Sequence, residues 1–334
     1  MRDLRSCKGK SAILMLAFGA LLSVHASAQV VIGEVDAYGS LEDNFGERED
    51  WIELFNEGLS FVDLTGWHLS DDPDEWDKWA LPPMSLAPGE RVVVFASGRD
   101  IGSIDHWECP ADDGDTWRYL LPTQPLSADW RTLDFDDSGW QSGPGSIGYG
   151  DGDDAVVVED ASTVFMRRTF SVVDVEELAH GWLSVDYDDG FVAFLNGREV
   201  ARSDNMENLS IAHDVESAFG HEAVLYQGGT PDAVPFDPRE WLVPGTNVFA
   251  VQVHNTNQNS SDLTARPFLA LGRSVPASIP FGGLPEWWTP AAPPAHTNFK
   301  LKPGEPVILS DGSGNIADLA TLPWSLRSLS LIDI

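Results

Sequence analysis

Short runs of β-branched and aromatic residues, separated by Gly, Pro, Asn and Asp, recur along this chain and constrain its fold more than any other feature. After residue 28 no segment sustains the apolar spacing of about 3.6 residues that marks an amphipathic helix. Short strands joined by turns are typical of β-sandwiches and barrels. We therefore expect an all-β protein, in which only Val173 to His180 looks modestly helical.

The clearest local element is a hairpin between Phe191 and Arg202. Two strand-like runs flank the pair Asn196-Gly197 there. Both central residues of a type I′ turn need positive φ, which Asn and Gly accept, so a tight hairpin is predicted. Further strands are expected at Val30–Ile32, Trp51–Phe55, Arg91–Phe95 and Asn247–His254.

Residues 1–28 have the order of a secretory signal peptide. Basic side chains within the first ten residues precede an apolar run from Ala12 to Leu22, and Ala26-Ser27-Ala28 supplies small residues for cleavage. The apolar run falls short of the roughly 20 residues that span a bilayer. We expect a secreted, extracellular or cell-surface protein with no membrane span after cleavage.

The charge balance restricts the partners. The chain carries 20 basic and 53 acidic side chains, a net charge of −33, and cleavage after Ala28 leaves 52 acidic against 16 basic residues. Nucleic acid and anionic membranes need basic patches, so neither is expected as a partner. An extracellular glycan or a surface protein remains. The same cleavage removes Cys7 and leaves Cys109, for which a small buried side chain is expected.

The segment 30–100 resembles the first part of a lamin tail domain of the bacterial secreted type. The matching stretches are Val31–Val35, Asp50–Asn56, Val62–Asp72, Leu86–Glu90 and Phe95–Asp100. The resemblance implies an immunoglobulin-like β-sandwich. Gly33 departs from the family, which usually carries Asn there.

The remaining strands of that sandwich are expected much later in the chain. In the family, a His-Thr-Asn-Phe-Lys-Leu segment and a Gly-Glu strand soon follow the Ala-Ser-Gly motif, and here they stand at His296–Leu301 and Gly304–Asp311. We infer one lamin tail domain in two pieces, 29–104 and 286–334, interrupted by an insert over 105–285. Two separate partial domains would each lack strands to cover their apolar face. Trp324 to Ile334 lacks the expected Tyr-Gly-Arg-type ending, which suggests a truncated or frameshifted product.

The insert, 105–285, resembles the galactose-binding-like jelly rolls found beside sugar-active enzymes. The stretches that carry the resemblance are Leu133–Trp140, Gly148–Asp154, Phe165–Phe170, Asp186–Phe191, Leu195–Val200 and Asn247–Asn255. The resemblance implies a β-sandwich of the jelly-roll type. Ligand binding does not follow from the fold, because many such modules only pack against neighbours.

Two acidic clusters are candidate metal sites. Asp151, Asp153 and Asp154 stand in a glycine-containing loop that suits Ca²⁺, a hard cation that takes several oxygen ligands. Asp188 and Asp189 belong to a second cluster, before the hairpin. The spacing is not that of an EF-hand. The alternative, which we favour for any single cluster, is that these carboxylates accept turn N–H groups and face water.

No catalytic constellation is apparent. The histidines lack the spacing of a zinc site, and Ser260-Ser261-Asp262 near His254 lacks a Gly-x-Ser-x-Gly elbow. We expect a non-catalytic exported module for adhesion, anchoring or assembly, an accessory part of a larger cell-surface or secreted protein. The alternative is a carbohydrate-binding module that grips a glycan through loops near Trp140, Asp188 and Asp189. Trp140 also fits a core role, and Trp287-Trp288 could clamp the insert to its host.

Overall fold

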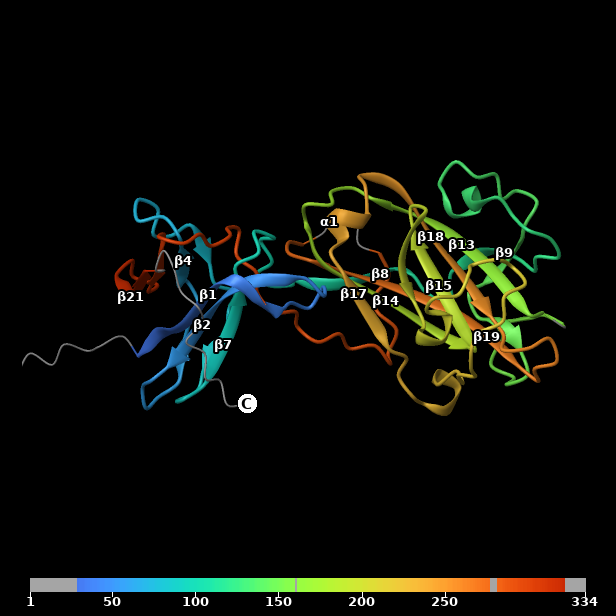
Figure 1. Cartoon of the computed structure of the whole chain (residues 1–334), viewed down its shortest axis with the longest axis horizontal. Helices are drawn as coiled ribbons and strands as arrows, with labels where there is room; N and C mark the ends of the chain where they lie inside the picture. Colours follow the sequence, from blue (N-terminus) through green and yellow to red (C-terminus); the bar gives the residue numbers. More distant parts are fainter. Residues whose placement is uncertain (1–28, 160, 277–280, 322–334) are drawn as a thin grey trace, which may run out of the picture.

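The computed structural model describes residues 29–159, 161–276 and 281–321, and it is all-β. Two groups of strands lie side by side along the long axis of the molecule (Figure 1). The expected signal peptide and the atypical C-terminal ending lie outside the described residues. The fold is an immunoglobulin-like sandwich interrupted by an inserted jelly roll.

One sheet of the immunoglobulin-like sandwich, which we call the host, has the order β1-β2-β7. Its strands are β1 (Val30–Glu42), β2 (Arg48–Asn56) and β7 (Arg91–Phe95). Ile52 and Leu54 on β2 are fully buried, as alternation along a strand with one face on a core requires.

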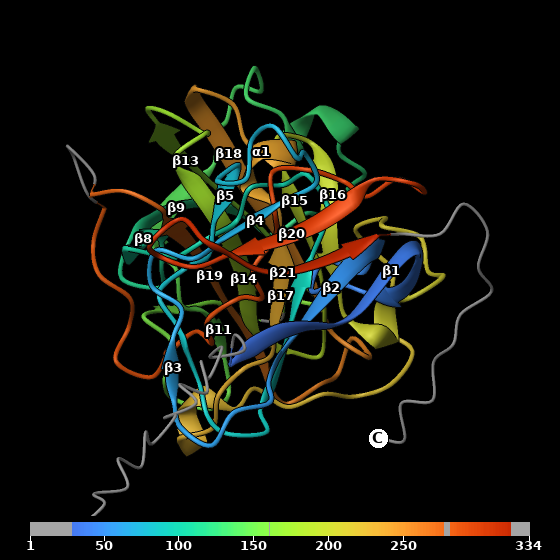
Figure 2. The same cartoon turned by 90° about the vertical axis from the view of Figure 1, so that its left-hand side faces the viewer.

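The opposite host sheet joins strands from both ends of the chain. Its order is β21-β20-β4-β5, and a two-stranded β3-β6 sheet lies beside it. The bounds are β3 (Val62–Asp63), β4 (His68–Ser70), β5 (Trp79–Ala80), β6 (Ser85–Leu86), β20 (Pro306–Ser310) and β21 (Ile316–Thr321). Leu309 on β20 pairs with Leu69 on β4, and Figure 2 shows these strands side by side. Leu69, Val307 and Phe299 share one core, so the later segment completes the sandwich begun by the earlier one.

The insert packs two larger sheets face to face. The first has the order β10-β9-β13-β18-β15-β16, and the second has the order β12-β11-β19-β14-β17, with β8 also pairing with β19. The first sheet comprises β9 (Thr116–Leu120), β10 (Gln141–Pro144), β13 (Thr163–Val172), β15 (Gly190–Leu195), β16 (Arg198–Arg202) and β18 (Gly245–His254). The second comprises β8 (His106–Ala111), β11 (Ile147–Tyr149), β12 (Val156–Val157), β14 (Leu178–Asp188), β17 (Ala233–Phe236) and β19 (Leu263–Arg273).

Both faces of the central insert strands are covered. On β13, Met166 belongs to the core between the sheets, whereas Phe165 belongs to an outer cluster with Trp130 and Trp140. On β19, Phe268 points to the other outer face, where Trp288 packs. This double burial explains why these strands are almost continuously apolar.

Helical structure among the described residues is confined to single turns. These are η1 (Ala128–Arg131), η2 (Asp204–Met206), η3 (Leu225–Gln227) and α1 (Pro238–Trp241). None of them has the length and apolar character of a membrane-crossing helix.

The Asn-Gly hairpin prediction is confirmed, because β15 and β16 pair and Asn196 and Gly197 have φ of 50° and 83°. The helical prediction for Val173–His180 is wrong. Asp174 instead accepts a hydrogen bond from the Glu176 N–H in a tight turn, and β14 then begins at Leu178.

Candidate functional site

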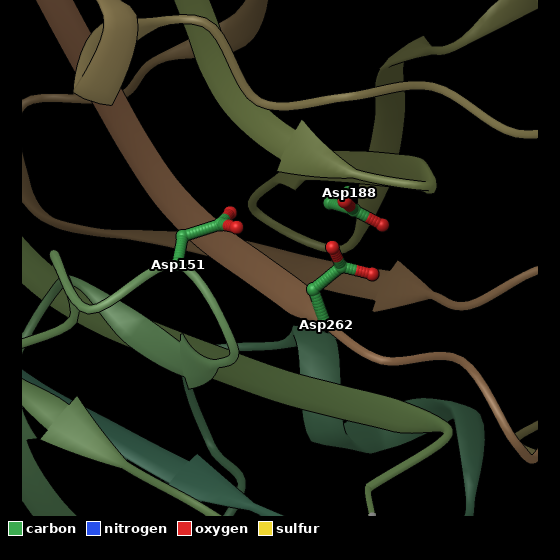
Figure 3. Close-up of side chains that lie close together, drawn as sticks. All are labelled: Asp151, Asp188 and Asp262. Carbon is green, nitrogen blue, oxygen red and sulfur yellow. The ribbon is translucent and has the colours of Figure 1, made fainter.

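Three carboxylates meet at one end of the second insert sheet and form what we call the acidic centre. Asp151 follows β11, Asp188 ends β14, and Asp262 directly precedes β19. One oxygen from each lies within 4.8 Å of the others. Figure 3 shows the three side chains converging from separate strand ends.

Strand pairing brings these residues together. β19 is antiparallel to both β11 and β14, with Tyr149 opposite Leu263 and Asp188 opposite Thr264. The start of β19 therefore lies beside the ends of both neighbours. At Gly150, whose φ is +107°, a Cβ would stand 2.6 Å from the Cβ of Asp262. Glycine thus permits the close approach of the Asp151 loop to Asp262.

The acidic centre holds buried oxygens without partners. Asp188 is 1 % exposed and Asp151 is partly buried, yet neither Oδ1 of Asp188 nor Oδ2 of Asp151 has a hydrogen-bond partner. Burial, followed by repulsion from Asp189 and Asp262, raises the pKa of Asp188 to about 8. Burial and Asp262 likewise raise the pKa of Asp151. The protein holds like charges together here at an electrostatic cost.

The other two residues of the predicted calcium loop take different positions. Asp153 accepts a hydrogen bond of 2.8 Å from Arg266, which also binds Asp113 at 2.6 Å. Neither carboxylate oxygen of Asp154 has a hydrogen-bond partner. Burial, then the charges of Asp153 and Asp151, raise the pKa of Asp154 to about 7.

Asp186 and Asp189 flank Asp188 and are satisfied by backbone donors. Asp186 accepts from the N–H groups of Val224 and Leu225 at 2.7 and 3.1 Å. Asp189 accepts from His221 N–H at 3.0 Å and Thr256 N–H at 2.7 Å. Both carboxylates are buried, at 1 % and 6 % exposure, so they organise loops from inside the fold.

Trp140, which the sequence offered either as a glycan contact or as a core residue, lies in the core. Trp140 is 9 % exposed and stacks on Trp130 with ring centroids 6.0 Å apart. Trp287 and Trp288 stack on each other at 5.2 Å, and both contact Phe268 of the insert. These tryptophans cover the outer faces of the insert sheets.

A groove of about 520 Å³ opens near Trp140. Leu133, Phe135 and Arg118 line it. Leu133 is 45 % exposed, and Arg118 donates a 3.4 Å hydrogen bond to the carbonyl of Trp140. Arg167, Arg168 and Asp137 also line this groove, so its lining is mostly polar, with Leu133 and Phe135 as its apolar part.

A second polar cluster, the joint, connects host and insert. Arg99 of the host donates hydrogen bonds to Asp237 at 2.9 Å and Glu240 at 2.7 Å in the insert. The Nε of Arg99 also lies 3.8 Å from a carboxylate oxygen of Asp43, which is buried. Opposite charges are therefore paired across the contact between the two sandwiches.

The joint also contains a chain of hydrogen bonds that the sequence did not reveal. Ser97 donates to Nδ1 of His296 at 2.9 Å, and Nε2 of His296 donates to Asn44 at 2.8 Å. Asn44 in turn donates to Nε2 of His180 in the insert at 3.0 Å. Burial lowers the pKa of His180 to about 4 and that of His296 to about 3, and the positive charge of Arg99 adds to the shift at His296.

Asp262 is the member of the acidic centre that sequence reasoning did not propose as a ligand. It was considered only as a partner for His254, but His254 is fully buried and its Nδ1 bonds the Val215 carbonyl at 2.8 Å. The pairing of β11 with β19 is what brings Asp262 close to Asp151, and this pairing cannot be read from the linear sequence.

The model of one known family matches this chain: the Lamin Tail Domain, over residues 23–174. That span runs through the first host strands and continues to β13 of the insert, while β20 and β21 lie beyond it. A single continuous range cannot represent a sandwich whose strands are separated by an insert. No curated protein matches the chain.

Solved structures similar to this chain include bacterial glycoside hydrolases. A β-glucuronidase of Bacteroides uniformis has 17 % identity and a TM-score of 0.33, over 50 % of this chain and 18 % of its own. A β-glucuronidase of Bifidobacterium dentium, complexed with coumarin-3-O-glucuronide, has 15 % identity and a TM-score of 0.34, over 52 % and 31 %. The chain thus spans less than a third of these enzymes.

Proposed function

We propose that this chain, which carries a lamin tail domain, is a non-catalytic exported module for adhesion, anchoring or assembly. A lamin tail domain fits an accessory module of a larger protein. The N-terminal charge and apolar pattern supports export to the cell surface or medium. The acidic composition makes a surface protein, or a glycan under the second candidate below, a better partner than nucleic acid.

The observation that carries the proposal is the joint. Domains connected by one linker pivot unless their interface is extensive. Here the chain crosses between host and insert twice, and the Arg99–Asp237 pair and the Asn44–His180 bond hold the two sandwiches against each other. A module that fixes the relative orientation of two sandwiches suits anchoring or spacing.

The Ser97–His296 pair does not favour catalysis. A serine nucleophile must reach its substrate, and Ser97 is 3 % exposed while His296 is fully buried. A histidine whose pKa is about 3 is also a weak base at neutral pH. The hydrogen bonds of this pair instead tie the strand after β7 to the returning host segment.

A carbohydrate-binding role is the second candidate, favoured by the groove beside Trp140. Its lining residues Leu133 and Phe135 offer apolar surface, and Arg118 offers donors. Under this candidate, a glycan would lie beside the buried Trp140 rather than on its ring. Asp188 is too buried to bind a glycan directly.

Glycan-array binding by the full chain separates the two candidates. Under the anchoring proposal, no specific saturable binding is expected. Saturable binding that is lost in Arg118→Ala, and kept in the control Arg131→Ala outside the groove, would replace the proposal with carbohydrate recognition. Arg118 is 43 % exposed in its side chain, so its removal should leave the fold intact.

A further inference from the structure

In the acidic centre, three strand ends each contribute a negatively charged carboxylate to the same small volume. Asp151, Asp188 and Asp262 each bring a carboxylate oxygen within 4.8 Å of the other two. The charge of Glu222 adds to the repulsion on both Asp151 and Asp188. In protein interiors such a group of carboxylates is stable only with protons or a counter-cation.

Asp188 is an independent indication of a ligand. Its side chain is 1 % exposed, and its Oδ1 has no hydrogen-bond partner. One of its carboxylate oxygens lies within 4.8 Å of oxygens of Asp151 and Asp262, and Figure 3 shows its carboxylate beside theirs. Its neighbours Asp186 and Asp189 show that this loop can satisfy buried carboxylates with backbone N–H groups. Asp188 alone among these three lacks such donors at Oδ1.

Among the described residues, Arg266 does not supply the missing positive charge. Its charge acts on neighbouring Asp154 and Asp186, but its guanidinium is already bonded to Asp113 and Asp153. The two nearby histidines, His221 and His254, do not supply this positive charge either. Nδ1 of His221 bonds the Tyr187 carbonyl, and His254 bonds within the core.

The donor set selects the kind of cation. Carboxylate oxygens without thiolate or imidazole suit a hard cation and not zinc. Ligands on three separate loops also suit the adaptable geometry of Ca²⁺ better than the strict octahedron of Mg²⁺.

We propose that Asp151, Asp188 and Asp262 bind one Ca²⁺ at the end of the second insert sheet. The ion crosslinks the end of β11, the end of β14 and the start of β19, which are neighbours in that sheet. It replaces three-way repulsion by attraction and orders the loop that begins at Gly150. Asp153 is not a ligand, because Arg266 holds it.

Calorimetric titration of the full chain with CaCl₂, after treatment with EDTA, tests the site. We expect one Ca²⁺ per chain and a rise in the midpoint of thermal unfolding that EDTA reverses. Asp188→Asn and Asp262→Asn should each weaken calcium binding at least about tenfold, because affinity follows the number of charged ligands. The control Asp134→Asn removes one exposed charge without a bonded partner and should bind as the wild type does.

Other outcomes overturn the site. One is a calcium response that NaCl of equal ionic strength reproduces, since that is screening alone. Another is wild-type affinity in both variants. Equal affinity for Mg²⁺ and Ca²⁺ would overturn the assignment of the ion. Should Asp188→Asn fail to fold, Asp262→Asn decides the matter, because Asp262 is partly exposed on a loop. None of these results depends on whether the chain binds a glycan.

Discussion

The joint and the acidic centre are both buried polar clusters, and they differ in how their charges are balanced. In the joint, Arg99 stands among carboxylates of both sandwiches. In the acidic centre, Asp151, Asp188 and Asp262 face one another. A buried cluster that balances its own charge contributes to holding the structure, whereas one that does not requires something from outside the chain. Perturbing each cluster should therefore give opposite results.

The largest effect is expected at the joint. Arg99→Met should destabilise the protein by about 3 to 5 kcal/mol, because it leaves Asp43 buried without its cationic partner and leaves Asp237 paired with Arg239 alone. Urea unfolding at pH 7 measures this loss. Arg198→Met is the control, since Arg198 is exposed and bonds only the Glu240 carbonyl while stacking on Trp241. Equal losses in the two variants would contradict the role given to the joint.

A smaller loss is expected next to the acidic centre, at Asp189. Asp189→Ala leaves the N–H groups of His221 and Thr256 without their acceptor, which costs about 2 to 3 kcal/mol. The loss should be the same with calcium and with EDTA, because Asp189 is satisfied by the chain itself. Asp188→Asn should behave in the opposite manner: it should lose no stability in EDTA, but it should be less stable than the wild type in the presence of calcium. If the loss of stability in Asp189→Ala depends on calcium, Asp189 belongs to the same calcium site as Asp188, and the distinction drawn here is wrong.

Acidification should weaken the joint through its histidines. The folded-state pKa of His180 is about 4, below the ordinary 6.5, so the unfolded chain binds the proton first as the pH falls. Stability from this group is complete above pH 6.5 and declines between pH 6.5 and 4. Between pH 7 and 4.5 the wild type should lose about 2 kcal/mol more than His180→Gln. The charged groups facing the two histidines are Asp237, Arg99, Arg239 and Asp43, whose carboxylate oxygen lies 4.0 Å from Nδ1 of His296.

His106 provides a control of opposite sign for that titration. Glu108 and then Asp105 raise its pKa, so its contribution to stability is present at low pH and is lost as the pH rises through that value. His106→Gln should therefore lose more stability than the wild type on acidification. Guanidinium unfolding at pH 7 and 4.5 measures the stability of the wild type, His180→Gln and His106→Gln. If the free energy of unfolding of His180→Gln changes with pH as steeply as that of the wild type, His180 does not contribute to the pH dependence of stability.

Sequence patterns predicted the fold better than the site, for a physical reason. The Asn196-Gly197 turn and the alternation in Asn247–His254 are local, so the sequence displays them directly. The prediction of a helix over Val173–His180 is wrong because the segment combines a turn at Asp174 with the start of a strand at Leu178, and only the pairing of that strand with β19 reveals this. The acidic centre takes one residue from each predicted cluster and adds Asp262. Its members meet through strand register, which neighbouring letters do not encode.

The place where the insert enters and leaves the host has a consequence for the order of folding. Asp105 N–H bonds the Arg273 carbonyl at 2.7 Å, so the two ends of the insert meet. During synthesis β1, β2, β4 and β7 emerge first, but β20, which pairs with β4, comes more than 200 residues later. The insert can fold before the host is complete, and its folding brings Ile101 beside His296, where the two residues form a bridge. The jelly roll would then act as an internal scaffold, without which the apolar faces of the early host strands stay open to aggregation.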